Sequence, residues 1–198
     1  MAEHLIETQE NGIATLTMNR PEARNAMSGE MMTAMTEALP RLAQDRNVRC
    51  VVLTGKGGAF CAGGDVKGFA SEASDSSADT KPRGFDLEGR SHGLRQGMEL
   101  SRILHEMPKP TLAAIPGPAA GAGFSLALAC DMRIAINTAK LTTAFSKVGL
   151  SGDYGGSFFL PYIVGQAKAR ELYFTAKIVS GQEAFDIGLV NRVTDADE

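Results

Sequence analysis

The chain has 198 residues and a net charge of −3, and this slight acidity argues against nucleic acid as its main partner. The length suffices to bury a core without disulfides and suggests a single domain. The three cysteines are an odd number without paired metal spacing, which predicts small core residues, a reducing compartment and no metal site. The sequence has neither a leader pattern nor an apolar stretch of about 20 residues. We therefore expect a cytoplasmic protein with no membrane partner.

A hairpin is predicted at the start of the chain. Asn11-Gly12 separates residues 5–9 from residues 13–18, where apolar and polar side chains alternate. This pattern predicts two antiparallel strands joined by a tight turn. Residues 19–26 are polar and predict a loop after the second strand.

A helix and a strand are expected next. Ser28 offers an N-cap for a helix over residues 29–45, in which apolar side chains recur at helical spacing. Pro40 lies inside this pattern, and we expect it to kink or divide the helix because proline cannot donate the backbone hydrogen bond. The apolar residues 50–54 then predict a buried strand.

Two glycine-rich turns are the central feature of the sequence. The first, residues 55–64, follows the predicted strand, and the second, residues 116–123, leads into residues 124–129, an apolar run with good helix formers. The first N–H groups of such a helix have no intrahelical partner, and the macrodipole makes that end electropositive. Together the turns could aim backbone donors at one oxyanion. Taken singly, either turn is more often a simple reversal of the chain.

Strands and helices alternate around these turns. Residues 70–84 are almost devoid of apolar side chains and predict a mobile loop, either a lid over the first turn or plain surface. A helical pattern over residues 94–107 ends at Pro108, and residues 111–115 predict a strand that leads to the second turn. Residues 132–136 predict another strand after it. This alternation indicates an α/β fold built from βαβ units.

A third glycine-rich turn, residues 144–157, contains one carboxylate, Asp153. Helices are expected after it over residues 157–164, 166–175 and 181–187. No internal repeat is present.

Four motifs in fixed order carry a resemblance to a known family. They are Asn19-Arg20-Pro21 with Asn25-Ala26, residues 53–65, residues 117–131 and residues 148–161. In this order they resemble the crotonase (enoyl-CoA hydratase/isomerase) superfamily. The resemblance implies an α/β fold in one domain, residues 1–198: a crotonase-type spiral of ββα units, of the ClpP/crotonase-like kind. It also implies helices after residues 188–190 that complete a trimer, and this sequence ends at Glu198.

The resemblance implies an acyl-CoA thioester substrate and no cofactor apart from the coenzyme A of that substrate. The thioester oxygen would be held by the backbone N–H groups of Ala62 and Ala122. Candidates to contact the CoA phosphates are Arg24, Lys56 and Lys67, and ordinary surface charge is the alternative for each. The other substrate contacts implied by motif position are Ala26, Gly63, Gly64, Asp65, Val66, Gly121 and Phe145.

The acid–base residues point to an isomerase. Hydratases of this superfamily carry two glutamates, and the matching positions here are Ser125 and Phe145, so the resemblance argues against two-glutamate hydration. Asp153 coincides with the aspartate that isomerases and aryl-CoA dehalogenases of the superfamily use. One base suffices to move a proton between two carbons while the oxyanion donors hold the dienolate. The alternative is that Asp153 only caps the following helix.

The leading expectation is therefore an enoyl-CoA or ring-acyl-CoA isomerase of fatty acid metabolism, assembled as a homotrimer or hexamer. An acyl-CoA hydrolase or dehalogenase that uses Asp153 and a non-catalytic CoA-thioester-binding protein are the alternatives. Ser125 and the likeness to Clp-type peptidases also suggest a serine peptidase. This reading is disfavoured because His4, His92 and His105 lie outside the three turns, so no base is expected beside the serine.

Overall fold

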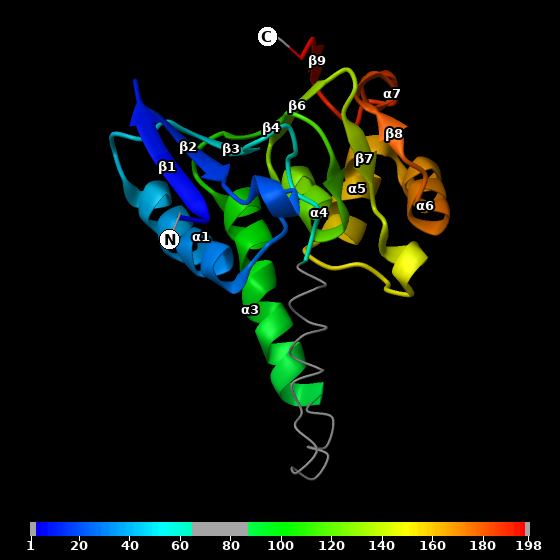
Figure 1. Cartoon of the computed structure of the whole chain (residues 1–198), viewed down its shortest axis with the longest axis horizontal. Coiled ribbons are helices and arrows are strands. Elements are labelled where there is room, and N and C mark those ends of the chain that lie inside the picture. The colour runs from blue at the N-terminus through cyan, green and yellow to red at the C-terminus, as the bar shows by residue number, and fades with distance from the viewer. Residues whose placement is uncertain (1–2, 65–86, 197–198) are drawn as a thin grey trace.

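The computed structural model describes residues 3–64 and 87–196. The strands of its larger sheet are β1 (Leu5–Glu10), β2 (Ile13–Met18), β3 (Cys50–Gly55), β4 (Thr111–Ile115), β6 (Met132–Ile136) and β9 (Arg192–Thr194). The helices are α1 (Gly29–Gln44), α3 (Leu87–Glu106), α4 (Gly121–Ala129), α5 (Gly156–Val164), α6 (Gln166–Thr175) and α7 (Gly181–Asp186). The sheet forms one layer above α1, α3 and α4 (Figure 1).

The larger sheet has the order β1-β2-β3-β4-β6-β9. The β1–β2 pair is antiparallel, and the four pairings that follow are parallel. The predicted hairpin is confirmed: Glu10 pairs with Ile13, and Asn11 and Gly12 between them have φ values of 52° and 81°. Two central residues with positive φ favour the type I′ turn, whose twist matches that of the strands.

Helix α1 is capped as predicted, because the Ser28 side chain accepts a hydrogen bond from the Met31 N–H at 3.2 Å. Its apolar face, which includes Met35 and Leu39, is buried in the core. Pro40 lies inside α1 and does not divide it. The carbonyl that loses its N–H partner to Pro40 belongs to Thr36, which lies on the exposed side of the helix and remains open to water.

The predicted α/β alternation is confirmed by the parallel strands β3, β4 and β6, with α3 before β4 and α4 between β4 and β6. Helix α3 begins at Leu87, earlier than the pattern indicated. Every residue of α4 is buried. Its uniformly apolar or small side chains allow it to run through the core rather than along the surface.

The sequence did not predict a second, three-stranded sheet, which consists of β5 (Ala119–Ala120), β7 (Lys140–Thr142) and β8 (Val179–Ser180). Strands of two or three residues are too short to show a period-two pattern. They form because the segment before α4 pairs with β7, which then pairs with β8. The helices predicted after the third turn are confirmed as α5, α6 and α7.

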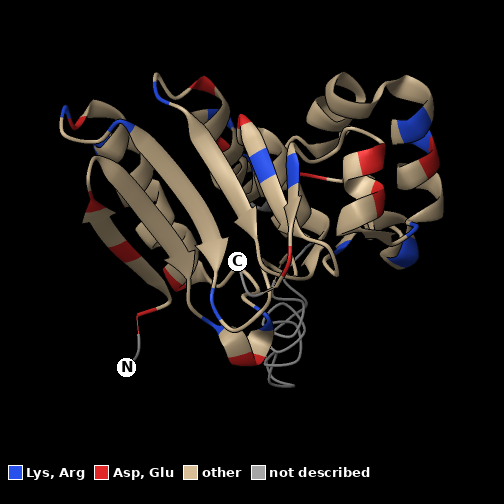
Figure 2. Cartoon of the chain, turned by 90° about the horizontal axis from the view of Figure 1, so that it is seen from above, with Lys and Arg blue, Asp and Glu red and all other residues tan. Residues whose placement is uncertain are grey.

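All three cysteines are free thiols. Burial raises the pKa of Cys61 and of Cys130 to about 12, so both stay protonated and act as core residues, as predicted; Cys50 is only half-buried. Figure 2 shows basic and acidic residues distributed over several of the described helices, strands and loops. Within the described residues, no helix is both long and apolar enough to cross a membrane. The loop predicted over residues 70–84 lies outside the described residues.

Candidate active site

The first two glycine-rich turns meet at the start of α4. The N–H groups of Phe60 and Cys61 donate to the Pro118 carbonyl at 2.9 and 3.2 Å, and the Ala120 N–H donates to the Cys61 carbonyl at 2.9 Å. Cys61 also forms a parallel bridge with Ala119. These bonds hold the turn that follows β3 against the N-terminal end of α4.

Glycine is required at this meeting point because backbone approaches backbone. A Cβ on Gly117 would lie 2.0 Å from the Gly58 carbonyl oxygen, and a Cβ on Gly123 would lie 2.5 Å from the Cys61 Sγ atom. Gly63 has a φ of 98°, and a Cβ there would lie 3.0 Å from the Ala120 carbonyl oxygen. The glycine pattern therefore serves close packing of two turns rather than simple reversals of the chain.

The N–H of Ala62, the first predicted donor, already has a partner in this structure. This N–H donates to the Arg24 carbonyl at 3.0 Å, so it is already bound and cannot turn to an oxyanion without losing that bond. The Gly63 N–H contacts the Cys61 Sγ atom at 3.5 Å. The Gly64 N–H has no hydrogen-bond partner among the described residues. Gly64, two positions further on, is therefore the candidate donor on this turn.

The predicted donor at Ala122 agrees with the geometry of the helix start. Ala122 is the second residue of α4, and the N-cap residue, Ala120, makes no side-chain hydrogen bond to the helix. The position of a Cβ built on Gly63 would be 3.5 Å from the Ala122 nitrogen. An N–H in the first turn of a helix has no intrahelical partner, so Ala122 and Gly64 present two unbound donors from adjacent turns.

The predicted base, Asp153, lies on the turn before α5. Its Oδ1 atom is buried and has no hydrogen-bond partner in the described part of the chain. Burial raises the pKa of this carboxyl group. The alternative role as a helix cap does not apply, because the N-cap of α5 is Gly155 and no side chain caps that helix. A partly desolvated carboxyl group with a buried, unpartnered oxygen is typical of a functional residue.

The segment around Asp153 is packed against α4. A Cβ on Gly156 would lie 2.4 Å from the Ser125 Oγ atom of α4 and 2.5 Å from the Tyr173 hydroxyl of α6. On the other side of Asp153, a Cβ on Gly152 would lie 3.4 Å from the Phe145 ring. Glycines on both sides of Asp153 thus allow this segment to pack closely against α4, α6 and the Phe145 ring.

Phe145 and Gly121 complete this contact. The nearest atoms to a Cβ on Gly121 are Phe145 ring carbons and the Thr143 carbonyl oxygen, at 3.8 Å. The Phe145 ring is buried and stacks on Tyr173, with centroids 6.3 Å apart and planes inclined by 5°. Ser125 is buried and donates to the Gly121 carbonyl of its own helix at 3.3 Å. Ser125 and Phe145, the positions that the resemblance matches to the hydratase glutamates, are therefore both buried and uncharged.

A buried asparagine that the sequence reading did not single out joins two of the predicted contact loops. The Asn25 Nδ2 atom donates to the carbonyls of Lys56 and Ala59 at 2.9 and 2.8 Å, and its Oδ1 atom accepts the Arg20 N–H at 2.8 Å. The side chains of Arg24 and Lys56 are exposed at this junction. The sequence analysis named Asn25 only as part of the first motif. Its role in joining the two loops depends on hydrogen bonds that form in the folded chain.

The remaining predicted contacts fall into two groups. Ala26 is buried, and the next residue, Met27, donates its N–H to the Gly63 carbonyl at 2.9 Å. Ala26 therefore lies in the core beside the first turn. Asp65, Val66 and Lys67 lie outside the described residues. Within the described part of the chain, no three His, Cys, Asp or Glu side chains are grouped so as to hold a metal ion.

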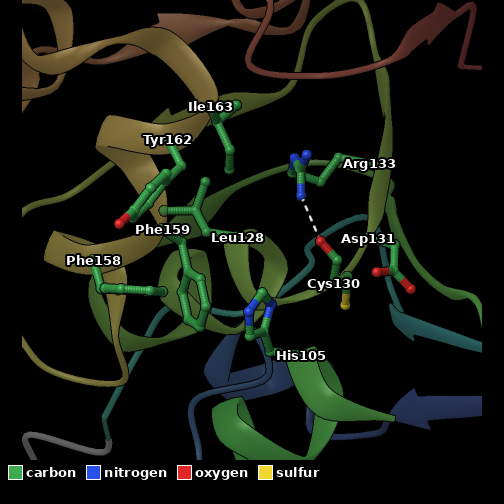
Figure 3. Close-up of a pocket in the computed structure, with 9 residues that line it drawn as sticks. All are labelled: His105, Leu128, Cys130, Asp131, Arg133, Phe158, Phe159, Tyr162 and Ile163. Carbon is green, nitrogen blue, oxygen red and sulfur yellow. Dashed lines mark hydrogen bonds between the residues drawn. The ribbon is translucent and has the colours of Figure 1, made fainter. Parts of the chain in front are cut away.

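A separate pocket of about 530 Å³ opens at the other end of α4. His105, Phe158 and Phe159 face one another along one side of it, and Arg133 lies on the other side (Figure 3). None of the predicted site residues lines this pocket. Its volume alone therefore does not identify the functional site.

Backbone N–H groups without a partner, together with a partly desolvated carboxyl group, are the groups that can hold an oxyanion while a single side chain moves a proton. The enoyl-CoA hydratase/isomerase family model matches residues 8–198. The chain belongs to this family and is an acyl-CoA enzyme of the crotonase superfamily.

The similar proteins carry different activities in their names. The 1,2-epoxyphenylacetyl-CoA isomerase of Escherichia coli (strain K12) is 37% identical, over 98% of this chain and 71% of the relative. The 4-chlorobenzoyl coenzyme A dehalogenase-1 of an Arthrobacter species is 36% identical, over 96% of this chain and 66% of the relative. The crystal structure of an enoyl-CoA hydratase from Polaromonas sp. JS666 has a TM-score of 0.85 and 36% identity, over 97% of this chain and 71% of that chain.

Proposed function

We propose that the protein is an acyl-CoA isomerase of the enoyl-CoA or ring-acyl-CoA type. The observation that carries the proposal is the half-buried carboxyl group of Asp153, whose Oδ1 atom is buried without a hydrogen-bond partner among the described residues. The side chains against its flanking glycines include Ser125 and Phe145, which are uncharged. One carboxylate suffices for a proton shift, whereas two-glutamate hydration needs a pair.

In the proposed reaction, the thioester oxygen accepts hydrogen bonds from the N–H groups of Gly64 and Ala122. The Asp153 carboxylate takes a proton from the carbon next to the carbonyl, the donors stabilise the dienolate oxygen, and the protonated carboxyl returns the proton two carbons away. Because the donors are fixed before the charge forms, each contributes on the order of 10²–10³ in rate. Burial, which raises the pKa of Asp153, makes its carboxylate a stronger base.

The test is incubation of the protein with a 3-enoyl-CoA in D₂O. We expect the 2-enoyl-CoA product with an intact thioester, and deuterium incorporation where the transferred proton exchanges with solvent. Release of free CoA would contradict the proposal and indicate hydrolysis.

Dehalogenation is the second candidate, because the same aspartate could act as a nucleophile and a relative at 36% identity is named as a dehalogenase. Release of chloride from 4-chlorobenzoyl-CoA would support it. Binding of acyl-CoAs without turnover on a broad panel would instead support a non-catalytic CoA-thioester-binding protein.

We further propose a homotrimer or hexamer located in the cytoplasm, and this rests on family membership. Sedimentation at micromolar concentration tests the assembly: a single species with the mass of one chain would contradict it.

A further inference from the structure

Tyr173 lies beside the proposed base and plays no part in the reaction described above. It lies on α6, and the chain on both sides of it is anchored: Thr143 donates to the Leu172 carbonyl at 3.0 Å, and Thr142 donates to the Ala176 carbonyl at 3.1 Å. Its ring is stacked on Phe145. The position of its hydroxyl group is therefore fixed by the surrounding structure.

The hydroxyl group of Tyr173 is buried and has no hydrogen-bond partner among the described residues. The Oδ1 atom of Asp153 shares this property, and Ser101 contributes the one other buried unpartnered side-chain oxygen found in the described part of the chain. Buried polar atoms are almost always paired, so two unpaired ones at one site point to a partner outside the chain, either a water molecule or a polar group of a ligand.

The two groups offer complementary chemistry. Burial first, and the nearby Asp153 charge second, raise the pKa of Tyr173 to about 12, so the phenol keeps its proton and can donate. The ionised Asp153 carboxylate can only accept. Ser125, the neighbouring hydroxyl against Gly156, is already committed to the Gly121 carbonyl. Tyr173 is thus the free donor at this end of the site.

We infer that the Tyr173 hydroxyl binds an oxygen atom carried by the acyl group of the substrate, so that the site selects acyl-CoAs with a hydroxyl, carbonyl or epoxide oxygen over plain alkyl chains. This inference rests on the proposed acyl-CoA function and assigns Tyr173 as a specificity-determining residue. An unsubstituted acyl chain would leave the phenol desolvated and unpaired, whereas an oxygen-bearing chain would satisfy it.

The experiment measures binding by isothermal titration calorimetry, for the wild type and Y173F. The probes are butyryl-CoA, both enantiomers of 3-hydroxybutyryl-CoA, and 4-hydroxybutyryl-CoA. We expect Y173F to weaken at least one hydroxy probe by about three- to tenfold, the range for one neutral hydrogen bond, and to leave butyryl-CoA unchanged. The matched control is Y162F on α5, where the ring is 79% exposed, and this variant should leave all four affinities unchanged.

Equal weakening of all four probes would overturn the inference, because it would mean that the hydroxyl only shapes the pocket. Unchanged binding of every probe would overturn it as well. If Y173F does not fold, the affinities of the wild type still test the inference. A wild type that binds no hydroxy probe more tightly than butyryl-CoA would overturn it. If the wild type binds none of the four acyl-CoA probes, the proposed function itself fails.

Discussion

The two ends of α4 differ in how their polar groups are satisfied. At the C-terminal end, Arg133 donates to the carbonyls of Leu189 and Cys130 at 2.9 and 2.7 Å, and Asp131 accepts from the N–H and the hydroxyl of Thr111 at 2.8 and 3.0 Å. The pocket drawn in Figure 3 lies at this C-terminal end of α4. At the N-terminal end, the Gly64 N–H and the Asp153 Oδ1 atom have no partner among the described residues.

This difference shows that the larger cavity is not the place where unpaired hydrogen-bond donors and acceptors are found. Asp131 and Arg133, the charged carboxylate and guanidinium groups in the lining of the large pocket, already bind the protein's own backbone. The N-terminal end keeps donors and acceptors unused, at a cost in stability, because unpaired buried polar groups are unfavourable. Such groups are retained where a ligand satisfies them.

The largest expected effect concerns the carboxyl group. D153N should lower turnover by roughly 10²–10⁴, the contribution of a positioned acid–base group, and leave acyl-CoA binding intact because the two side chains have nearly the same shape. Steady-state kinetics and calorimetric titration separate these two effects. The matched change at the other end of α4, D131N, should leave turnover unchanged. Wild-type turnover by D153N would mean that the base lies elsewhere.

Removal of a backbone donor is the next test. A122P deletes the N–H of the second residue of α4, and in the first helical turn this removes no intrahelical hydrogen bond. Turnover should fall by about 10²–10³, with a smaller loss of affinity, because the charge on the oxygen develops chiefly in the transition state. Melting temperature must be measured alongside. Equal turnover in a folded A122P protein would refute the role of this N–H group.

The other end of α4 should respond through stability. R133M removes a buried guanidinium that binds the carbonyls of Cys130 and Leu189. Each acceptor left unpaired costs about 1–3 kcal/mol of the free energy of unfolding, which chemical denaturation would measure. Turnover of the folded fraction should not change. A loss of turnover without a loss of stability would assign a function to the pocket of Figure 3.

The smallest expected effect is a pH dependence of stability that arises from Asp153. Burial raises its pKa in the folded state above the unfolded value, so the unfolded chain releases this proton first as the pH rises. The carboxyl group therefore destabilises the fold above its unfolded pKa. D153N should be more stable than the wild type at pH 7, and thermal unfolding at a series of pH values should show the gap closing as both states become protonated. A gap that stays constant with pH would contradict this account.

Local signals in the sequence determined the regular elements. The Asn11-Gly12 turn, the Ser28 cap and the alternation of apolar runs each depend on neighbouring residues alone, and each was predicted and confirmed. The motif order pointed to the family, which the match over residues 8–198 confirms. The sequence also singled out Asp153 as the one carboxylate on the third glycine-rich turn, and its role as the base stays a prediction.

Only the tertiary structure decided which groups are free to act. Whether the N–H of Ala62 or of Gly64 is available depends on where the Arg24 carbonyl lies, a contact across 38 residues of chain that no local pattern encodes. The place of Tyr173 beside Asp153 likewise depends on the packing of α6 against Phe145. The three strands of the smaller sheet exist because distant segments pair. The local spacing of residue types specifies helices, strands and turns. Whether a donor or an acceptor is hydrogen-bonded depends on distant residues that the fold brings into contact with it.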